Sequence, residues 1–193
     1  MTFRRTILTL LLTLFCTVGI ATLSQGQVKP ESLSLIPQPV KLTTQKGNFL
    51  VQPSTKVYVD PKNDDLLRVG EFLAEHIEGA IGHKPEVIRK KPKKKETNLI
   101  YLTLKTKNDT LGAEGYTLQV KEGRITLAAK EAHGAFLGIQ TVRQLLPTQK
   151  TTGSALIPAL EIVDKPRYTW RGMHLDVTRH FFPVEFGKQY IDY

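Results

Sequence analysis

The sequence is poor in cysteine and in negative charge. Its single cysteine, Cys16, lies in an apolar run near the N-terminus, so the chain cannot form an intramolecular disulfide. The 18 acidic residues are outnumbered by 27 lysines and arginines, and the net charge at pH 7 is +9. No glycine-rich phosphate loop and no nucleophile elbow occurs, which leaves phosphoryl transfer and serine-hydrolase chemistry without sequence support. Internal repeats and low-complexity tracts are absent as well.

The one long apolar run predicts an export signal. Arg4 and Arg5 precede an uncharged stretch at residues 7–21, and small residues follow up to Gly26. This arrangement is typical of a secretory signal peptide over residues 1–26, and it predicts a periplasmic or extracellular protein. An uncleaved membrane anchor is the alternative. A bilayer core, however, requires about 20 apolar residues, which is more than the stretch at residues 7–21 supplies. Cys16 as the lipid acceptor of a lipoprotein is a second alternative, but Thr13, Leu14 and Phe15 before it are poor matches to the small residues expected there. We expect no stable membrane insertion after cleavage.

The positive charge is concentrated in one short segment. Residues 89–95 (RKKPKKK) supply six positive charges, and without them and the two N-terminal arginines the net charge is only +1. Such a run can bind nucleic acid or direct nuclear import. The prolines at positions 85 and 92 and the export signal instead favour a solvated loop between two elements. We therefore expect no nucleic-acid partner.

Residues 33–163 predict an α+β layer, a mixed or antiparallel sheet with two helices on one face. Apolar residues recur every three or four positions over residues 64–81 and 131–146, which predicts two amphipathic helices. Asn63 or Asp64 would cap the first helix, and Gly82 would end it. Runs of β-branched and aromatic residues predict strands, at residues 49–51, 56–60, 86–89, 98–104, 115–120, 124–128 and 155–163.

Three glycine-containing sites add detail to this layer. Gly47 and Asn48 predict a turn that ends an extended entry segment. Residues 121–123 join two strands as a hairpin. Gly134 and Gly138 lie one helical turn apart in the second helix. Each costs about 1 kcal/mol relative to alanine, so we expect a close approach of that helix to the sheet.

The last part of the chain reads as a strand, a loop and a helix. Residues 170–177 predict the strand, and helical spacing begins after Pro183. In a barrel built from such units, reactive residues follow the carboxyl ends of the strands, and Arg179 and His180 have that position. Asp176 lies near the end of the strand. Arg179 could read sugar hydroxyls through its five fixed donors, or it could form only a structural ion pair with Asp176.

The segment PRYTWRGMHLDVTRHFFPVEF at residues 166–186 closely resembles the opening of the catalytic domain in glycoside hydrolase family 20, the β-N-acetylhexosaminidases. Upstream, LIPQPV at 35–40, GYTL at 115–118 and GIQTVRQLL at 138–146 resemble the accessory domain of that family. The resemblance implies an accessory α+β domain over residues 27–165. It also implies that residues 166–193 begin a truncated (β/α)8 barrel.

The resemblance also implies a reaction. Enzymes of this family remove terminal non-reducing N-acetylglucosamine or N-acetylgalactosamine by a substrate-assisted retaining mechanism, outside the usual two-carboxylate scheme. Arg179 takes the position of the arginine that grips ring hydroxyls, with Asp176 and His180 as possible supports. The family's catalytic Asp-Glu pair has no counterpart before residue 193, so no catalytic residue is assigned and the chain alone is predicted to be inactive.

No metal or cofactor is expected, because the histidines lack ligand-like spacing. The alternative function is a secreted, non-catalytic module that binds carbohydrate or an anionic surface.

Overall fold

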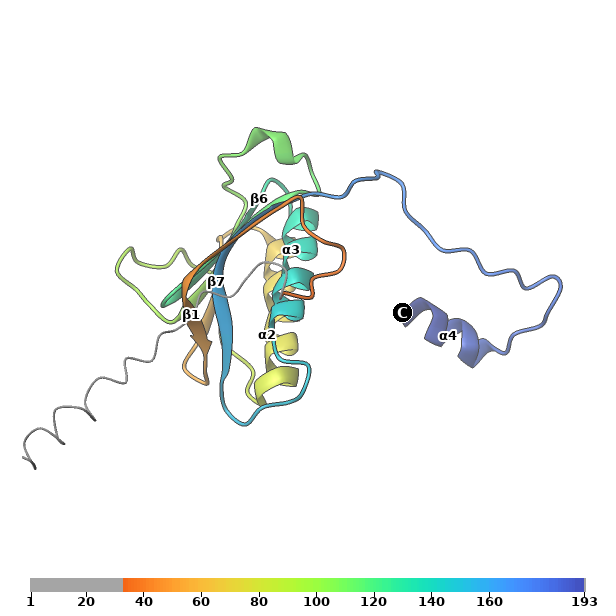
Figure 1. Ribbon diagram of the computed structural model, residues 1–193, viewed down its shortest axis with the longest axis horizontal. Helices are drawn as coiled ribbons and strands as arrows, with labels where there is room; N and C mark the ends of the chain where they lie inside the picture. The colour runs from red at the N-terminus through yellow and green to blue at the C-terminus, as the bar shows by residue number, and fades with distance from the viewer. Residues whose placement is uncertain (1–32, 193) are drawn as a thin grey trace, which may run out of the picture.

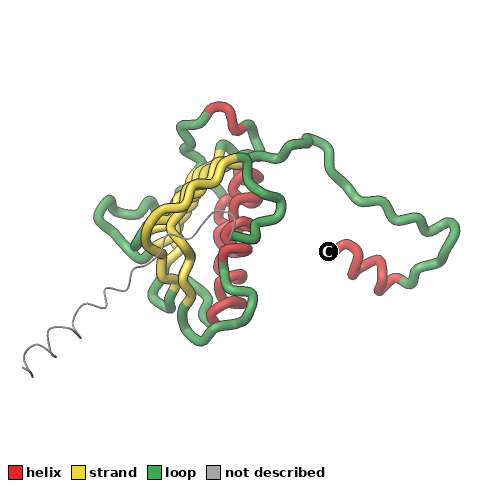
Figure 2. The backbone as a smooth tube through the Cα atoms, in the orientation of Figure 1, coloured by secondary structure: helices red, strands yellow, loops and turns green. Residues whose placement is uncertain are grey.

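A computed structural model of the protein describes residues 33–192. The predicted signal peptide and Cys16 lie outside the described residues, so export stays a prediction. Figures 1 and 2 show a twisted sheet with two long helices packed on one face and a separate C-terminal arm. The elements in chain order are β1 Lys41–Val51, β2 Lys56–Val59, α2 Asp64–Ile81, β3 Val87–Ile88, β4 Leu99–Thr103, the 3-10 turn η2 Asp109–Leu111, β5 Tyr116–Lys121, β6 Arg124–Ala129, α3 Ala132–Leu145, β7 Ala155–Asp164 and α4 Val184–Asp192.

The sheet is mixed, as predicted. Its strand order is β1-β7-β5-β6-β4-β2-β3. The β1/β7, β5/β7 and β5/β6 pairs are antiparallel, whereas β4/β6, β2/β4 and β2/β3 are parallel. The parallel pair β2/β3 is connected through α2, because two parallel strands require a crossover rather than a hairpin. The predicted hairpin between β5 and β6 is confirmed, and β3 lies at an edge of the sheet.

Helix α2 begins and ends where the sequence predicts. The side chain of Asn63 accepts a hydrogen bond from the Leu66 amide at 2.7 Å, which satisfies one free N–H of the first turn. Gly82 ends the helix in the left-handed conformation, with φ of 77°. Its apolar stripe, including Leu66, Leu73 and Ile77, is fully buried against the sheet.

Helix α3 approaches the sheet closely, which confirms the packing role expected for its glycines. A Cβ on Gly138 would overlap the buried side chain of Leu127 in β6. A Cβ on Gly134 would lie 2.5 Å from the carbonyl oxygen of Gly115. The absence of side chains at these two positions therefore sets the distance between α3 and the sheet.

The predicted turn at Gly47 and Asn48 is wrong. Strand β1 runs through both residues and pairs with β7 up to Thr44 and again from Asn48 onward. The ladder shifts register between Thr44 and Asn48, and Gly47 has φ of 97°. Such a bulge absorbs extra residues without ending the strand, so pairing with β7 overrides the local turn signal.

The predicted strand at residues 170–177 is not formed in the described residues. These residues form no β-ladder, whereas the helix predicted after Pro183 is present as α4. A strand requires a neighbour for its backbone hydrogen bonds, and within residues 33–192 no other segment pairs with this one. Helix α4 buries none of its residues and lies away from the sheet in Figure 1. Trp170 and Ile191 are 92% and 82% exposed, so this arm keeps apolar side chains in solvent.

The basic segment at residues 89–95 connects β3 to β4 and is a loop, as predicted. Among residues 33–192, no helix combines the length and the hydropathy that a bilayer span requires.

Candidate functional site

Arg179 forms an ion pair with Asp176 in the loop before α4. Nε of Arg179 donates to Oδ2 of Asp176 at 2.6 Å, and a terminal nitrogen of the guanidinium contacts the same oxygen. Oδ1 of Asp176 accepts from the Thr178 amide at 2.9 Å. The Thr178 amide, followed by the Arg179 guanidinium, holds the pKa of Asp176 below its usual range. The structural ion pair that the sequence left open is therefore present.

This ion pair leaves most of Arg179 accessible. The Arg179 side chain is 88% exposed, and that of Asp176 is 31% exposed. Asp176 holds one edge of the guanidinium, and the remaining N–H groups face solvent. An orienting carboxylate with free donors beside it is an arrangement that binds hydroxyl or carboxylate oxygens.

His180 lies in a row of rings rather than against Arg179. Its ring meets Phe182 edge-on at 5.0 Å, and Phe182 stacks on Phe186 at 4.4 Å. Tyr190 continues the row and donates from its hydroxyl to the carbonyl of His174 at 2.9 Å. Within residues 33–192 no hydrogen bond joins His180 to Arg179 or Asp176. The supporting role of His180 therefore stays a prediction.

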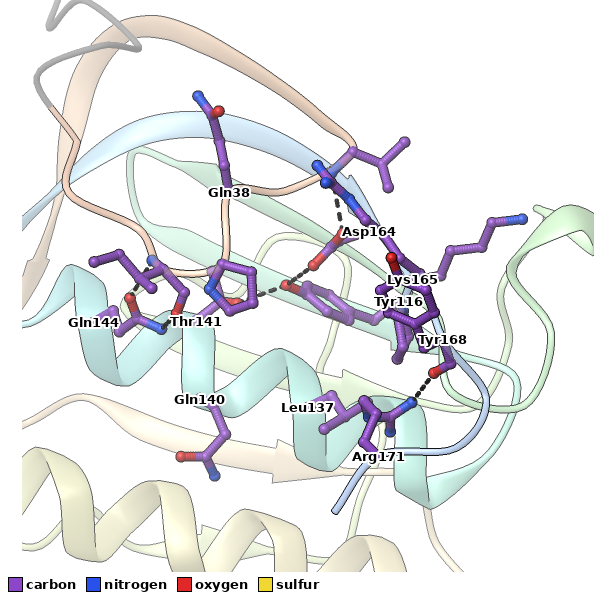
Figure 3. Close-up of a pocket in the computed structure, with 15 residues that line it drawn as sticks. Gln38, Tyr116, Leu137, Gln140, Thr141, Gln144, Asp164, Lys165, Tyr168 and Arg171 are labelled. Carbon is purple, nitrogen blue, oxygen red and sulfur yellow. Dashed lines mark hydrogen bonds between the residues drawn. The ribbon is translucent and has the colours of Figure 1, made fainter. Parts of the chain in front are cut away.

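A pocket of about 450 Å³ lies where the chain leaves β7, and Figure 3 shows it. At its base the hydroxyl of Tyr116 donates to Oδ2 of Asp164 at 3.1 Å and lies 2.6 Å from Oγ1 of Thr141. Because a phenol has one proton, Thr141 is the donor in the second bond. Burial, opposed by Thr141 and reinforced by Asp164, raises the pKa of Tyr116. The phenol is therefore neutral at any physiological pH.

The N-terminal segment closes one side of this pocket. Gln144 of α3 clamps Ile36, accepting from its amide at 2.8 Å and donating to its carbonyl at 2.9 Å. Oδ1 of Asp164 accepts from the Val40 amide at 3.0 Å. Asp164 is the only carboxylate among the residues that line the pocket, and both its oxygens are engaged. A glycosidase that acts through paired carboxylates needs two, and the lining of this pocket supplies one.

One ion pair ties the C-terminal arm to the sheet. Arg171 donates to both carboxylate oxygens of Glu114, at 3.1 Å and 2.7 Å, and His133 lies 3.5 Å from the same carboxylate. The Arg171 guanidinium lowers the pKa of Glu114. Sequence reasoning missed this pair, because Glu114 and Arg171 are 57 residues apart and no periodicity links them.

The described residues offer no metal centre. Over residues 33–192, no three His, Cys, Asp or Glu side chains gather closely enough to hold an ion. Arg179, Asp176 and His180 are the predicted site residues, and the structure brings Arg179 and Asp176 into direct contact.

Comparison with known proteins identifies relatives over most of the chain. Residues 32–165 match the family model "Glycosyl hydrolase family 20, domain 2". A β-hexosaminidase of Porphyromonas gingivalis is 32% identical, with 84% of this chain and 21% of the relative covered. A β-N-acetylhexosaminidase of Cellulomonas fimi is 33% identical, with 82% of this chain and 31% of the relative covered.

Solved structures give the same result. The β-N-acetylhexosaminidase of Streptomyces coelicolor superposes with a TM-score of 0.71 at 32% identity, over 86% of this chain and 33% of that one. A mutant Streptomyces plicatus β-hexosaminidase in complex with the product GlcNAc has a TM-score of 0.70 at 31% identity, over 86% and 32% of the two chains. The chain therefore spans a third or less of the length of each of these relatives.

Proposed function

The chain belongs to glycosyl hydrolase family 20, and from this membership we propose that it forms the N-terminal part of a β-N-acetylhexosaminidase. Residues 1–26 would direct export, residues 27–165 would form the accessory domain, and residues 166–193 would begin a (β/α)8 catalytic domain. The observation that carries the proposal is the match of residues 32–165 to the second domain of that family, together with the coverage of a third or less of the relatives' chains.

The exposed apolar side chains of the arm support the barrel part of this proposal. Trp170, Met173, Val177 and Ile191 are between 59% and 92% exposed. Large apolar side chains that gather in one exposed segment mark a surface that another element covers. In a barrel, residues 170–177 would pair with neighbouring strands on both sides, and α4 would pack on the outside of the sheet.

The substrate would be a glycan ending in β-linked N-acetylglucosamine or N-acetylgalactosamine. Arg179 would donate to ring hydroxyls of that terminal sugar, and Asp176 would fix the orientation of the guanidinium through the bond of 2.6 Å. The acetamido oxygen of the substrate would attack the anomeric carbon. The Asp-Glu pair that assists this reaction would belong to residues outside this chain, so none of its carboxylates is assigned a catalytic role.

The test compares this chain with the protein translated from the whole reading frame around it. Hydrolysis of 4-nitrophenyl N-acetyl-β-glucosaminide is measured with both. We expect the longer protein to release 4-nitrophenol and the chain of 193 residues to release none. No release by the longer protein from either the glucosaminide or the galactosaminide would refute the proposed activity, and turnover by the chain alone would refute the assignment of catalysis to residues outside it.

A further inference from the structure

The loop between β3 and β4 gathers unpaired positive charge on one side of the molecule. Lysines at positions 90, 91, 93, 94 and 95 are all exposed, and within residues 33–192 no hydrogen bond or ion pair occupies their ammonium groups. Arg89, at the start of the loop, is instead paired with Asp64 at 2.7 Å. The lysines therefore form a patch, named here the lysine loop, that has five charges available for a ligand.

The lysine loop lies over the face of the sheet that the helices leave open. Val57 and Val59 point into the core beneath α2, so Tyr58 between them points to the opposite face. The hydroxyl of Tyr58 donates to Oε1 of Glu96 at the end of the loop. Figure 1 shows this yellow-green loop projecting from the sheet on the side away from α2 and α3.

Fixed contacts hold the loop in one shape. Arg124 of β6 donates to the carbonyl oxygens of Lys93 and Glu96, at 3.0 Å and 2.9 Å. Oε2 of Glu96 accepts from the Lys93 amide at 3.0 Å, and Pro92 is buried. A backbone that is already ordered loses less conformational entropy when a ligand binds. The loop thus presents its lysines as a prepared surface rather than as a flexible basic tail.

The lysines surround an open depression. Lys90, Lys93, Lys95, Tyr58 and Glu96 line a volume of about 510 Å³. The hydrogen bond from Tyr58, and then that from the Lys93 amide, lower the pKa of Glu96, so its carboxylate stays ionised and engaged in the loop. The same bond raises the pKa of Tyr58 to about 12, so the phenol adds no negative charge. One carboxylate therefore faces the ammonium groups of three lysines in the depression, which attracts anions.

We propose that the lysine loop binds the sulfate or carboxylate groups of an acidic polysaccharide. Ammonium groups on flexible stems neutralise such anions as point charges. Residues 89–98 include no exposed large apolar side chain that could enter a membrane. Tyr58 is only 6% exposed, so it gives no platform on which a nucleic-acid base could stack. The choice of a glycan over other polyanions rests on the proposed hexosaminidase function, whereas the cationic surface itself does not.

The test measures binding of a fluorescent heparin-derived decasaccharide to the chain of 193 residues, by anisotropy at low and at physiological salt. Lys90, Lys93 and Lys95 are replaced together by glutamine in one variant. A matched control replaces Lys41, Lys130 and Lys150, which are equally exposed and lie outside the loop. We expect the loop variant to bind about tenfold more weakly, since each exposed pair contributes modestly. Its affinity should also depend less on salt, because fewer counterions are released.

The control variant should bind within about twofold of the parent chain. The parent chain should bind the decasaccharide more tightly than it binds oligothymidylate or phosphatidylserine vesicles. Equal losses in both triple variants, no loss in the loop variant, or tighter binding to the oligonucleotide or the vesicles would each overturn the proposal. If the loop triple variant does not fold, the three single lysine-to-glutamine variants test the proposal instead, and each should lose about twofold in affinity for the decasaccharide. Binding is measured without hydrolysis, so failure here is distinct from failure of the proposed activity.

Discussion

Gly134, in the first turn of α3, lies directly against the backbone carbonyl of Gly115 at the entry to β5. A Cβ on Gly134 would be 2.5 Å from that oxygen and 3.0 Å from the carbonyl oxygen of Ala113. Backbone atoms at the start of a strand cannot move aside as the end of a flexible side chain can. This contact therefore fixes how closely α3 packs on the sheet.

Replacing Gly134 by alanine should destabilise the fold despite the higher helix propensity of alanine. The steric cost of overpacking is about 1 to 3 kcal/mol, against a propensity gain of about 1 kcal/mol. We expect a net loss of up to about 2 kcal/mol in the free energy of unfolding by urea. The matched control is Gly79→Ala in α2, where no atom lies within 4 Å of the added Cβ. The control should be neutral or stabilising, and equal effects of the two substitutions would contradict the packing account.

Asp60 should make stability depend on pH in the acidic range. Its buried carboxylate accepts hydrogen bonds from Tyr101, Thr103 and the Leu104 amide. Burial opposes ionisation, but these hydrogen bonds prevail and the pKa of Asp60 is lowered. A carboxyl whose pKa is lower in the folded state stabilises the fold above its unfolded pKa of about 3.9. That contribution disappears as the pH falls through the folded-state pKa.

The substitution Asp60→Asn tests this pH dependence. At pH 7 we expect a loss of about 1 to 3 kcal/mol, because an amide cannot accept from all three donors. The difference between the variant and the parent chain should shrink as the pH is lowered below about 4, measured by urea unfolding at several pH values. A difference that stays constant from pH 7 to the acid limit would show that the charge of Asp60 makes no contribution.

Removing the charge of Glu114 should release the C-terminal arm without unfolding the sheet. Glu114→Gln breaks the two-point contact with Arg171, and an exposed ion pair contributes only about 0 to 1 kcal/mol. We expect faster trypsin cleavage after Arg167 and Arg171 at an unchanged urea midpoint. Glu75→Gln in α2, which removes the exposed pair with Lys84, is the control and should leave the cleavage rate unchanged. Equal cleavage of the Glu114 variant and the parent chain would mean that Arg171 does not hold the arm.

Local patterns in the sequence predict the elements of the sheet layer but not their partners. Helix α2 is predicted with its cap at Asn63 and its end at Gly82, because both signals lie within a few residues of the helix itself. The turn predicted at Gly47 fails, because the β7 strand that keeps β1 intact lies more than 100 residues away in the chain. A turn signal is local, whereas a ladder is not.

In the candidate site too, contacts between residues close in the sequence can be predicted, whereas contacts between distant residues cannot. The ion pair between Asp176 and Arg179 spans three positions and is open to sequence reasoning. The pairing of Glu114 with Arg171 and the cluster around Asp60 join residues 41 to 57 positions apart, and no short motif marks them. The strand predicted at residues 170–177 fails for lack of a neighbour, since alternating apolar residues alone do not make a ladder.

The central claim is that Arg179 holds the terminal sugar of a hexosaminide substrate. It is tested most directly by kcat/KM for 4-nitrophenyl N-acetyl-β-glucosaminide in the protein translated from the whole reading frame around this chain, with Arg179→Ala compared with Arg68→Ala. Arg68 is an exposed arginine of α2 whose ion pair with Asp65 lies on the surface. Loss of several charge-assisted hydrogen bonds should lower kcat/KM of the Arg179 variant by about 100-fold or more, while the Arg68 variant stays at the parent value. A kcat/KM for Arg179→Ala close to that of the parent would contradict the account.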